Sequence, residues 1–212
     1  MKHLKTFALA AVAAGALMAF VGAGTASATE LCSTTTAAGT ACPAGQKITT
    51  PLLFTLSSGT SALFKETTIE GGATLDTCEI SSIGEEITNS GSSTTTVTGT
   101  ITKLTWGGCT FPTTTTLRGK LEIYRIAGTS NGTVTSDTET KVTINTIFFG
   151  SCVYTVPAGE SFGELTEGKP AVLHANAVIH KVTPSPLPCP TTGTWTATYT
   201  LTEPKETTVS VS

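Results

Sequence analysis

Apolar and polar residues alternate along much of the chain with the period of two that is typical of β-strands. The clearest example lies near the end, where Trp195, Ala197, Tyr199 and Leu201 alternate with threonines. A strand with this pattern places its apolar residues on one face and its polar residues on the other. We therefore predict an amphipathic strand whose apolar face lies in the core.

Other β-rich runs precede this strand, separated by Gly, Ser or polar segments. Thr, Val and Ile dominate them, and branched side chains of this kind favour a pleated surface. Residues 83–93 are predicted to form a polar connection. The fold class is therefore all-β, an antiparallel β-sandwich of roughly nine or ten short strands. The predicted strands are 52–56, 62–69, 73–80, 94–106, 117–124, 141–149, 152–156, 171–182 and 194–201.

One pattern occurs twice in the chain. Residues 101–111 and residues 144–154 both read I-x-x-[L/I]-x-[W/F]-G-[G/S]-C-x-[F/Y]. Each copy is a β-rich run that is closed by a small pair and a cysteine. The duplication predicts two similar corners of strand, turn and strand, each held by a disulfide.

The first 28 residues differ from the rest. Lys2 and Lys5 precede an apolar run at residues 7–21, and the segment ends in the tripeptide A-S-A at residue 28. This layout is typical of a secretory signal peptide, and the run is shorter than the about 20 residues that span a bilayer. We expect cleavage after residue 28, no transmembrane segment in the remainder, and a secreted or cell-envelope location.

Composition divides the remaining chain into three parts. Residues 29–50 are mainly Thr, Ala and Gly, which predicts an N-terminal loop tethered by a disulfide. Residues 51–203 contain the strands and form the predicted β-sandwich domain. Residues 204–212 are predicted to be a C-terminal tail.

All six cysteines lie after residue 28. An even number in an exported chain favours disulfides, although six cysteines allow 15 pairings. The repeat supports separate partners for its two equivalent cysteines. A zinc site is the rival interpretation, but the chain has no C-x-x-C motif and no Cys/His cluster. The simplest prediction is three sequential disulfides, Cys32–Cys42, Cys78–Cys109 and Cys152–Cys189.

Charge removes several classes of partner from consideration. The chain has 15 acidic and 12 basic residues, a net charge of −3, and no basic cluster. Nucleic-acid binding needs a basic surface, so no nucleic-acid partner is expected. Asp76 and Asp137 are the only aspartates, which disfavours a calcium loop. No cofactor motif occurs, and we expect neither cofactor nor metal.

Residues 159–163 match G-x-S-x-G, with Ser161 at the centre. As a nucleophile elbow this motif needs a strand before it and a helix after it. Gly168 and Pro170 interrupt the following residues, and no helix is predicted there. Ser161 is therefore interpreted as a loop residue, and the protein as non-enzymatic.

His174, Asn176 and His180 would lie on one face of a strand. Two of them are histidines six residues apart, which is about 20 Å along an extended strand. That separation is too long for one ion to bind both imidazoles. Exposed strand histidines are the favoured interpretation.

Three aromatic residues form a candidate contact patch: Phe148, Trp106 and Trp195. Phe148 is apolar on the otherwise polar face of its strand, so either the strand is covered on both faces or this residue belongs to an exposed patch. The two tryptophans would offer a stacking platform for sugars if they were exposed. Their position on the apolar faces of their strands favours burial.

The corners at residues 107–109 and 150–152, together with the W-T-A-T-Y strand at residues 195–199, resemble those of uncharacterised secreted, disulfide-linked bacterial β-proteins. They are more remotely similar to exported proteins of the alkane-oxidation-activator type. The resemblance spans residues 50–203. It implies no catalytic residue, and its alkane association implies contact with apolar compounds.

These observations together predict a non-enzymatic secreted protein with a structural, adhesive or self-associating role at the cell surface or outside the cell. Its partner would be a surface or matrix component or a second copy of the chain. The alternative is a binding module for a carbohydrate or an apolar small molecule, which would use an open sheet face or the space between sheets.

Overall fold

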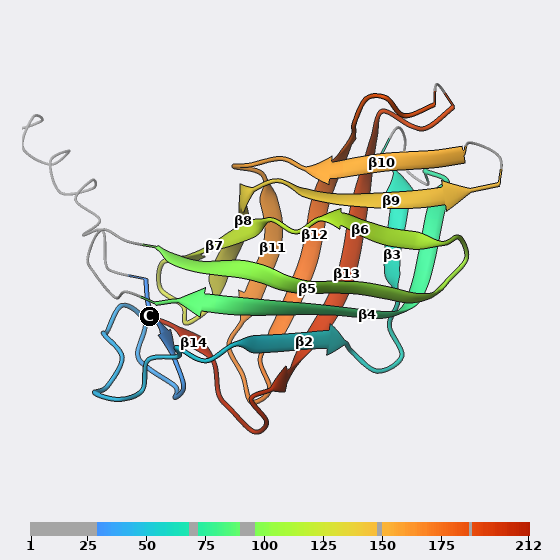
Figure 1. Ribbon diagram of the computed structural model, residues 1–212. Helices are drawn as coiled ribbons and strands as arrows, with labels where there is room; N and C mark the ends of the chain where they lie inside the picture. Colours follow the sequence, from blue (N-terminus) through green and yellow to red (C-terminus); the bar gives the residue numbers. More distant parts are fainter. Residues whose placement is uncertain (1–28, 68–71, 90–95, 148–149, 187) are drawn as a thin grey trace, which may run out of the picture.

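The computed structural model describes residues 29–67, 72–89, 96–147, 150–186 and 188–212 (Figure 1). Within these ranges the strands pair in antiparallel fashion and no helix is formed, so no helix is present that could span a membrane. The predicted signal peptide lies outside the described residues. The strands are β1 (Leu31–Cys32), β2 (Leu52–Leu56), β3 (Ala62–Glu66), β4 (Thr74–Thr88), β5 (Val97–Cys109), β6 (Thr113–Leu117), β7 (Lys120–Arg125), β8 (Gly132–Thr138), β9 (Thr140–Thr146), β10 (Gly150–Val156), β11 (Ser161–Thr166), β12 (Val172–Lys181), β13 (Thr192–Glu203) and β14 (Ser210–Val211).

Hydrogen-bonded strands close into a barrel with eight strand positions. Single strands occupy seven of the positions, in the order β4, β5, β7, β8, β11, β12 and β13. The eighth position is shared by β2 and β3, because each of them pairs with β13 on one side and with β4 on the other. β2 pairs with residues 82–85 of β4, and β3 pairs with residues 74–78. Two short strands placed end to end therefore complete the ring.

Three further strands, β10, β9 and β6, extend from the barrel. β10 pairs with the end of β12 at Tyr154 and Thr155, β9 pairs with β10, and β6 pairs with β9. β6 then lies beside β5, where the Trp106 indole donates a hydrogen bond to Thr115 Oγ1 at 3.0 Å. Figure 1 shows these strands with β5 and β4 as a front layer that crosses steeply over β11, β12 and β13.

The all-β antiparallel class is confirmed, but the arrangement differs from the expected sandwich of nine or ten strands. The described ranges hold 14 strands, and the main sheet closes on itself. The 15-residue β4 is one reason, because it pairs with β3 at one end and with β2 at the other. Residues 83–88 were expected in a polar connection, yet they belong to β4. There Ile83, Glu85 and Ile87 are all buried.

The core lies inside the barrel and is centred on Trp195. This side chain is fully buried, and its ring centroid lies 5.1 Å from that of Trp106, 5.0 Å from that of Phe162 and 6.0 Å from that of Phe64. Buried and half-buried residues alternate from residue 192 to residue 202 of β13. The predicted amphipathic strand is therefore confirmed.

The segments that flank the barrel pair with each other. Leu31 and Cys32 of β1 pair with Val211 and Ser210 of β14. Residues 204–212 are thus more than the expected tail, because Val209 and Val211 are fully buried and the Val211 amide donates to the carbonyl of Ser130 at 2.8 Å. Apolar side chains near the end of the chain supply the reason for this docking.

Candidate functional site

The structure does not assemble the three aromatic residues of the predicted contact patch on the surface. Trp195 is 0 % exposed, so it offers no face to a ligand. Trp106 is half-buried and packs against the core with its indole nitrogen bonded to Thr115. Phe148 lies outside the described residues. A stacking platform made of the two tryptophans is therefore excluded.

The cysteines form the three sequential disulfides that were predicted: Cys32–Cys42, Cys78–Cys109 and Cys152–Cys189. Cys78 and Cys109 are also direct cross-strand partners in β4 and β5. Because the cysteines are bonded in pairs, they offer no thiolate to a metal. The groups that include Asp76 or Glu30 beside cysteines are thus not zinc sites in this state.

The two copies of the repeated pattern adopt different structures, contrary to the prediction of two similar corners. The first copy remains within β5 up to Cys109, whereas the second is divided between β9 and β10. Glycines with positive φ lie at different points of the pattern, at Gly108 in the first copy and at Gly150 in the second. The bend in the chain therefore falls one residue earlier in the second copy than in the first.

A buried carboxylate, Asp76, organises the end of the first copy and the residues that follow it. Its Oδ1 accepts hydrogen bonds from the amides of Thr77 at 2.8 Å and Phe111 at 3.0 Å, and its Oδ2 accepts one from the Thr113 hydroxyl. These bonds occupy both oxygens and hold the turn between β5 and β6. Asp76 has a structural role that satisfies buried donors.

Ser161 does not stand on a nucleophile elbow. It is exposed and begins β11, and the residues that follow it continue as a strand through Thr166. Gly159 lies in the turn before it, with a φ of +82°. The helix that the elbow requires is replaced by a strand, so the strained turn that would expose a nucleophile is not formed here.

The outer face of β12 and β13 carries the polar residues that the sequence placed on one face. His174 and Asn176 are exposed and His180 is half-buried, and the alternate residues of β12 point into the core. On β13 the outward positions hold threonines. His174 pairs with Thr198 and Asn176 with Thr196, so this part of the face is polar and uncharged apart from the imidazoles.

A hollow of about 270 Å³ lies on this face. It lies beside the turn that joins β2 to β3, the two strands that share the eighth barrel position. This turn forms one side of the hollow. The Ser57 amide and the Thr60 hydroxyl both bond to the carbonyl of Thr198, at 2.9 and 3.4 Å. The lining residues are Thr60, Ser61, His174, Ala175, Asn176, Thr196, Ala197 and Thr198.

The hollow offers hydroxyl, amide and imidazole groups for hydrogen bonding, and its lining contains no carboxylate or amine. Hydroxyl groups donate and accept, the amide of Asn176 does both, and a neutral imidazole does both through its two nitrogens. Within the described part of the chain, the side chains of His174, Asn176 and Thr196 hydrogen-bond to no other protein group. They are available to a ligand. Sequence reasoning placed His174 and Asn176 on one face but did not bring Thr196, Thr60 or Ser61 beside them, because only the strand pairing does so.

No protein-family model, curated protein or solved structure matches this chain. The resemblance to secreted bacterial β-proteins thus stays a prediction.

Proposed function

We propose that this chain is an exported, non-enzymatic adhesive module that binds a neutral saccharide in the hollow on the outer face of β12 and β13. The observation that carries the proposal is the lining of this hollow, where six polar side chains from three chain segments meet around about 270 Å³. Three of these side chains, His174, Asn176 and Thr196, hydrogen-bond to no other group in the described part of the chain. A ligand rich in hydroxyl groups matches them, because each hydroxyl both donates and accepts.

The shape of the hollow favours one unit of a longer chain over an enclosed small molecule. Its volume is below the about 300–1,000 Å³ of pockets that bury drug-sized ligands, and it opens onto an extended sheet face. A single sugar ring can occupy it while the neighbouring rings pass over the strands. The absence of an aromatic stacking surface among the lining residues implies weak binding at each site, so adhesion would depend on several sites acting together.

Export is supported by the three disulfides, which persist in oxidising compartments, and by the signal-like first 28 residues. A surface location agrees with the low content of charged residues, 13 %, and with the many outward threonines. The non-enzymatic role is supported by the strand that follows Ser161, where a hydrolase would need a helix.

The double variant Asn176→Ala, Thr196→Ala is expected to bind saccharide about tenfold more weakly than the wild-type protein. Each lost hydrogen bond contributes about 0.5–1.5 kcal/mol, and about 1.4 kcal/mol corresponds to a factor of ten. Binding would first be located on an array of neutral and acidic oligosaccharides. It would then be measured by calorimetry with the best neutral ligand.

The matched control is Val178→Ala, Thr194→Ala, which changes two outward residues that pair with each other on the same two strands outside the hollow. We expect this control to bind like wild type. Retention of no neutral oligosaccharide by the wild-type protein, or equal affinity in both double variants, would contradict the proposal.

We infer a second role, self-association through the end of β9. Ile147 follows β9 and is 79 % exposed, the most exposed large apolar side chain of the described residues. It also adjoins Phe148, which the sequence singled out. Exposed apolar side chains of this kind favour contact with another apolar surface, and the occupant proposed here is a second copy of the chain.

Light scattering coupled to size-exclusion chromatography is expected to detect a dimer of the wild-type protein whose population falls in Ile147→Ser. The loss of one buried apolar side chain weakens association by about 1.5–3 kcal/mol. Tyr124→Ser, at a 40 % exposed position on β7, serves as the control and should leave the dimer intact. A monomeric wild-type protein at all concentrations would exclude this role.

A further inference from the structure

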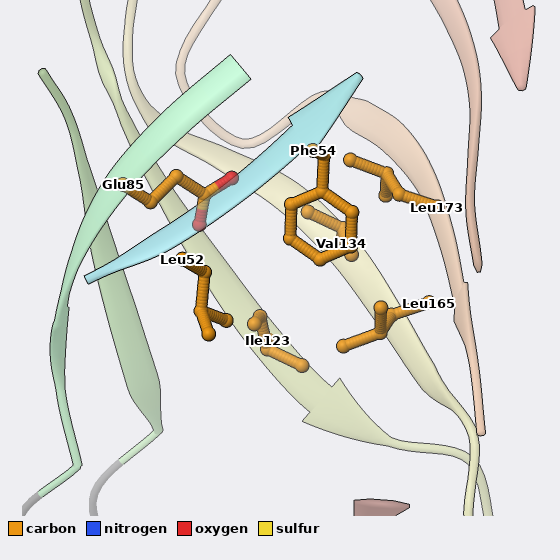
Figure 2. Close-up of a pocket in the computed structure, with 7 residues that line it drawn as sticks. All are labelled: Leu52, Phe54, Glu85, Ile123, Val134, Leu165 and Leu173. Carbon is orange, nitrogen blue, oxygen red and sulfur yellow. The ribbon is translucent and has the colours of Figure 1, made fainter. Parts of the chain in front are cut away.

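One carboxyl group points into the barrel. Glu85 belongs to β4 and is 4 % exposed. It lies on the inward positions of the strand with Ile83 and Ile87, which are also buried. Figure 2 shows its carboxyl directed toward the side chains of β2.

Apolar side chains surround this carboxyl. The cavity beside it has a volume of about 10 Å³, which is close to the space that a single water molecule needs. No hydrogen bond joins Glu85 to another side chain in the described part of the protein. The other residues that line the cavity are Leu52, Phe54, Ile123, Val134, Leu165 and Leu173 (Figure 2).

No described charged side chain compensates Glu85. Among the strands that pack around it, the buried titratable groups are Tyr199 of β13, whose hydroxyl bonds to Ser81 at 3.0 Å, and Asp76, nine residues earlier in β4, whose oxygens accept the hydrogen bonds described above. The other titratable residues of these strands are exposed or half-buried. They are Glu79, Glu86, Lys103, Lys120, Glu122, Tyr124, Arg125, Asp137, Glu164, His174, His180, Lys181 and Glu203.

The neighbouring strand is shaped to leave room for the carboxyl. A Cβ atom at Gly99 of β5 would collide with Glu85 Oε2, so the absence of a side chain at Gly99 creates the space that the carboxyl fills. The pairing of β4 with β5 also shifts register between Gly84 and Glu85, which leaves Thr102 as an extra residue in β5. Bulges of this kind redirect side chains, and they are common beside functional groups.

Burial favours the neutral carboxyl. It raises the pKa of Glu85 from 4.5 to about 7, and burial is the single cause. The group is therefore protonated inside the barrel in mildly acidic solution. At higher pH it must either hold an uncompensated charge in an apolar cavity or reach water.

We propose that Glu85 is a proton-controlled switch of barrel closure, in which the barrel is closed at β2 while the carboxyl is protonated and opens at β2 when the carboxyl is ionised. β2 is the strand that would move. Leu52 of β2 pairs directly with Glu85, and both Leu52 and Phe54 line the cavity.

β2 is also one of the two shortest strands of the barrel, the other being β3. It has five residues, occupies half of a barrel position, and pairs with β13 through a register shift between Leu201 and Glu203. Its departure exposes one side of the cavity to water and leaves β3 to hold the other half of the position. The remaining barrel strands keep their pairing.

The direction of the pH effect follows from the raised pKa. The closed barrel retains its proton between pH 4.5 and about 7, whereas the open form loses it. Closure is therefore strongest below pH 4.5 and is progressively lost as pH rises through about 7. Between pH 5.5 and pH 8.0 the open-to-closed ratio is expected to rise about 30-fold.

Hydrogen–deuterium exchange of the whole protein at pH 5.5 and pH 8.0, corrected for the intrinsic exchange rates, tests this switch. In the wild-type protein, peptides that cover β2 and residues 81–88 should lose protection at pH 8.0 by up to that 30-fold factor, and peptides from β8 and β11 should not. Glu85→Gln keeps the shape but cannot ionise, so its protection should not depend on pH. Glu86→Gln, which changes the exposed neighbour, should behave like wild type.

Equal pH dependence in Glu85→Gln and wild type, or protection of β2 that is independent of pH in wild type, would overturn the proposal. A second measurement does not depend on the folding of any variant. Carbon-13 NMR of the glutamate side-chain carboxyls in the wild-type protein should contain one that titrates near pH 7, and titration of all of them near pH 4.5 would also overturn it.

Discussion

Replacing Trp195 with alanine is expected to lower the free energy of unfolding by about 3–5 kcal/mol, the usual cost of truncating a buried aromatic residue. Its ring is fully buried and contacts the rings of Trp106, Phe162 and Phe64 from three other strands. The change leaves a large cavity and also removes edge-to-face ring contacts. Urea unfolding followed by circular dichroism would measure the loss.

Trp106→Ala provides the comparison within the same cluster. Trp106 is half-buried, and its indole nitrogen bonds to Thr115 at the edge of the barrel. We expect a smaller loss of stability than for Trp195→Ala. A larger loss of stability for Trp106→Ala than for Trp195→Ala would contradict the central position of Trp195 in the core.

Removing the Cys152–Cys189 disulfide with a double alanine variant is expected to cost about 4 kcal/mol of stability, since the bond closes a loop with a sequence separation of 37. Its local effect should be concentrated in β10. That strand pairs with β12 at only two positions, Tyr154 with Lys181 and Thr155 with His180. The disulfide supplies a further link between β10 and the chain beyond β12.

Thermal unfolding and hydrogen–deuterium exchange would be measured together on this variant. Exchange should increase in β9 and β10 more than in β7 and β8. The double alanine variant of Cys32 and Cys42, whose sequence separation is 10, should lose about 3 kcal/mol and leave β10 protected. Unchanged protection of β9 and β10 without Cys152–Cys189 would show that strand pairing alone holds them.

The sequence predicted the features that depend on local pattern. Alternation identified the buried face of β13, and cysteine parity with sequential spacing identified the disulfides. The same reasoning joined residues 117–124 into one strand, although the structure ends β6 at Leu117 and begins β7 at Lys120. Gly119 separates the strands because its backbone lies against Thr138 too closely for any side chain.

The features that sequence reasoning missed depend on pairing between distant segments. Period two shows which face of a strand is apolar but does not show which strand lies beside it, so neither the closed barrel nor the shared position of β2 and β3 was predictable. The segment around Glu85 does carry a sequence signal for a strand, because Ile83, Glu85 and Ile87 occupy alternate positions. The many polar residues of 83–93 nevertheless favour the interpretation of this segment as a polar connection.

The residues of the hollow also divide into those that local spacing predicts and those that only strand pairing brings together. The common face of His174, Asn176 and His180 follows from their spacing and is confirmed. Thr60 and Ser61 come from a turn more than 100 residues earlier in the chain, and only the pairing of β2 and β3 with β13 brings them to this face.

The shared barrel position of β2 and β3 also determines when the protein can fold. Thr55 pairs with Thr200 and Phe64 with Trp195, so closure of the ring joins segments from opposite ends of the barrel sequence. Contacts of such long range carry a large loop-closure entropy and slow the folding rate. A chain whose synthesis has not yet reached β13 leaves β2 and β3 as open sheet edges, and open edges of this kind pair readily with other chains. Association through these open edges is therefore a hazard for this fold until β13 has paired with them.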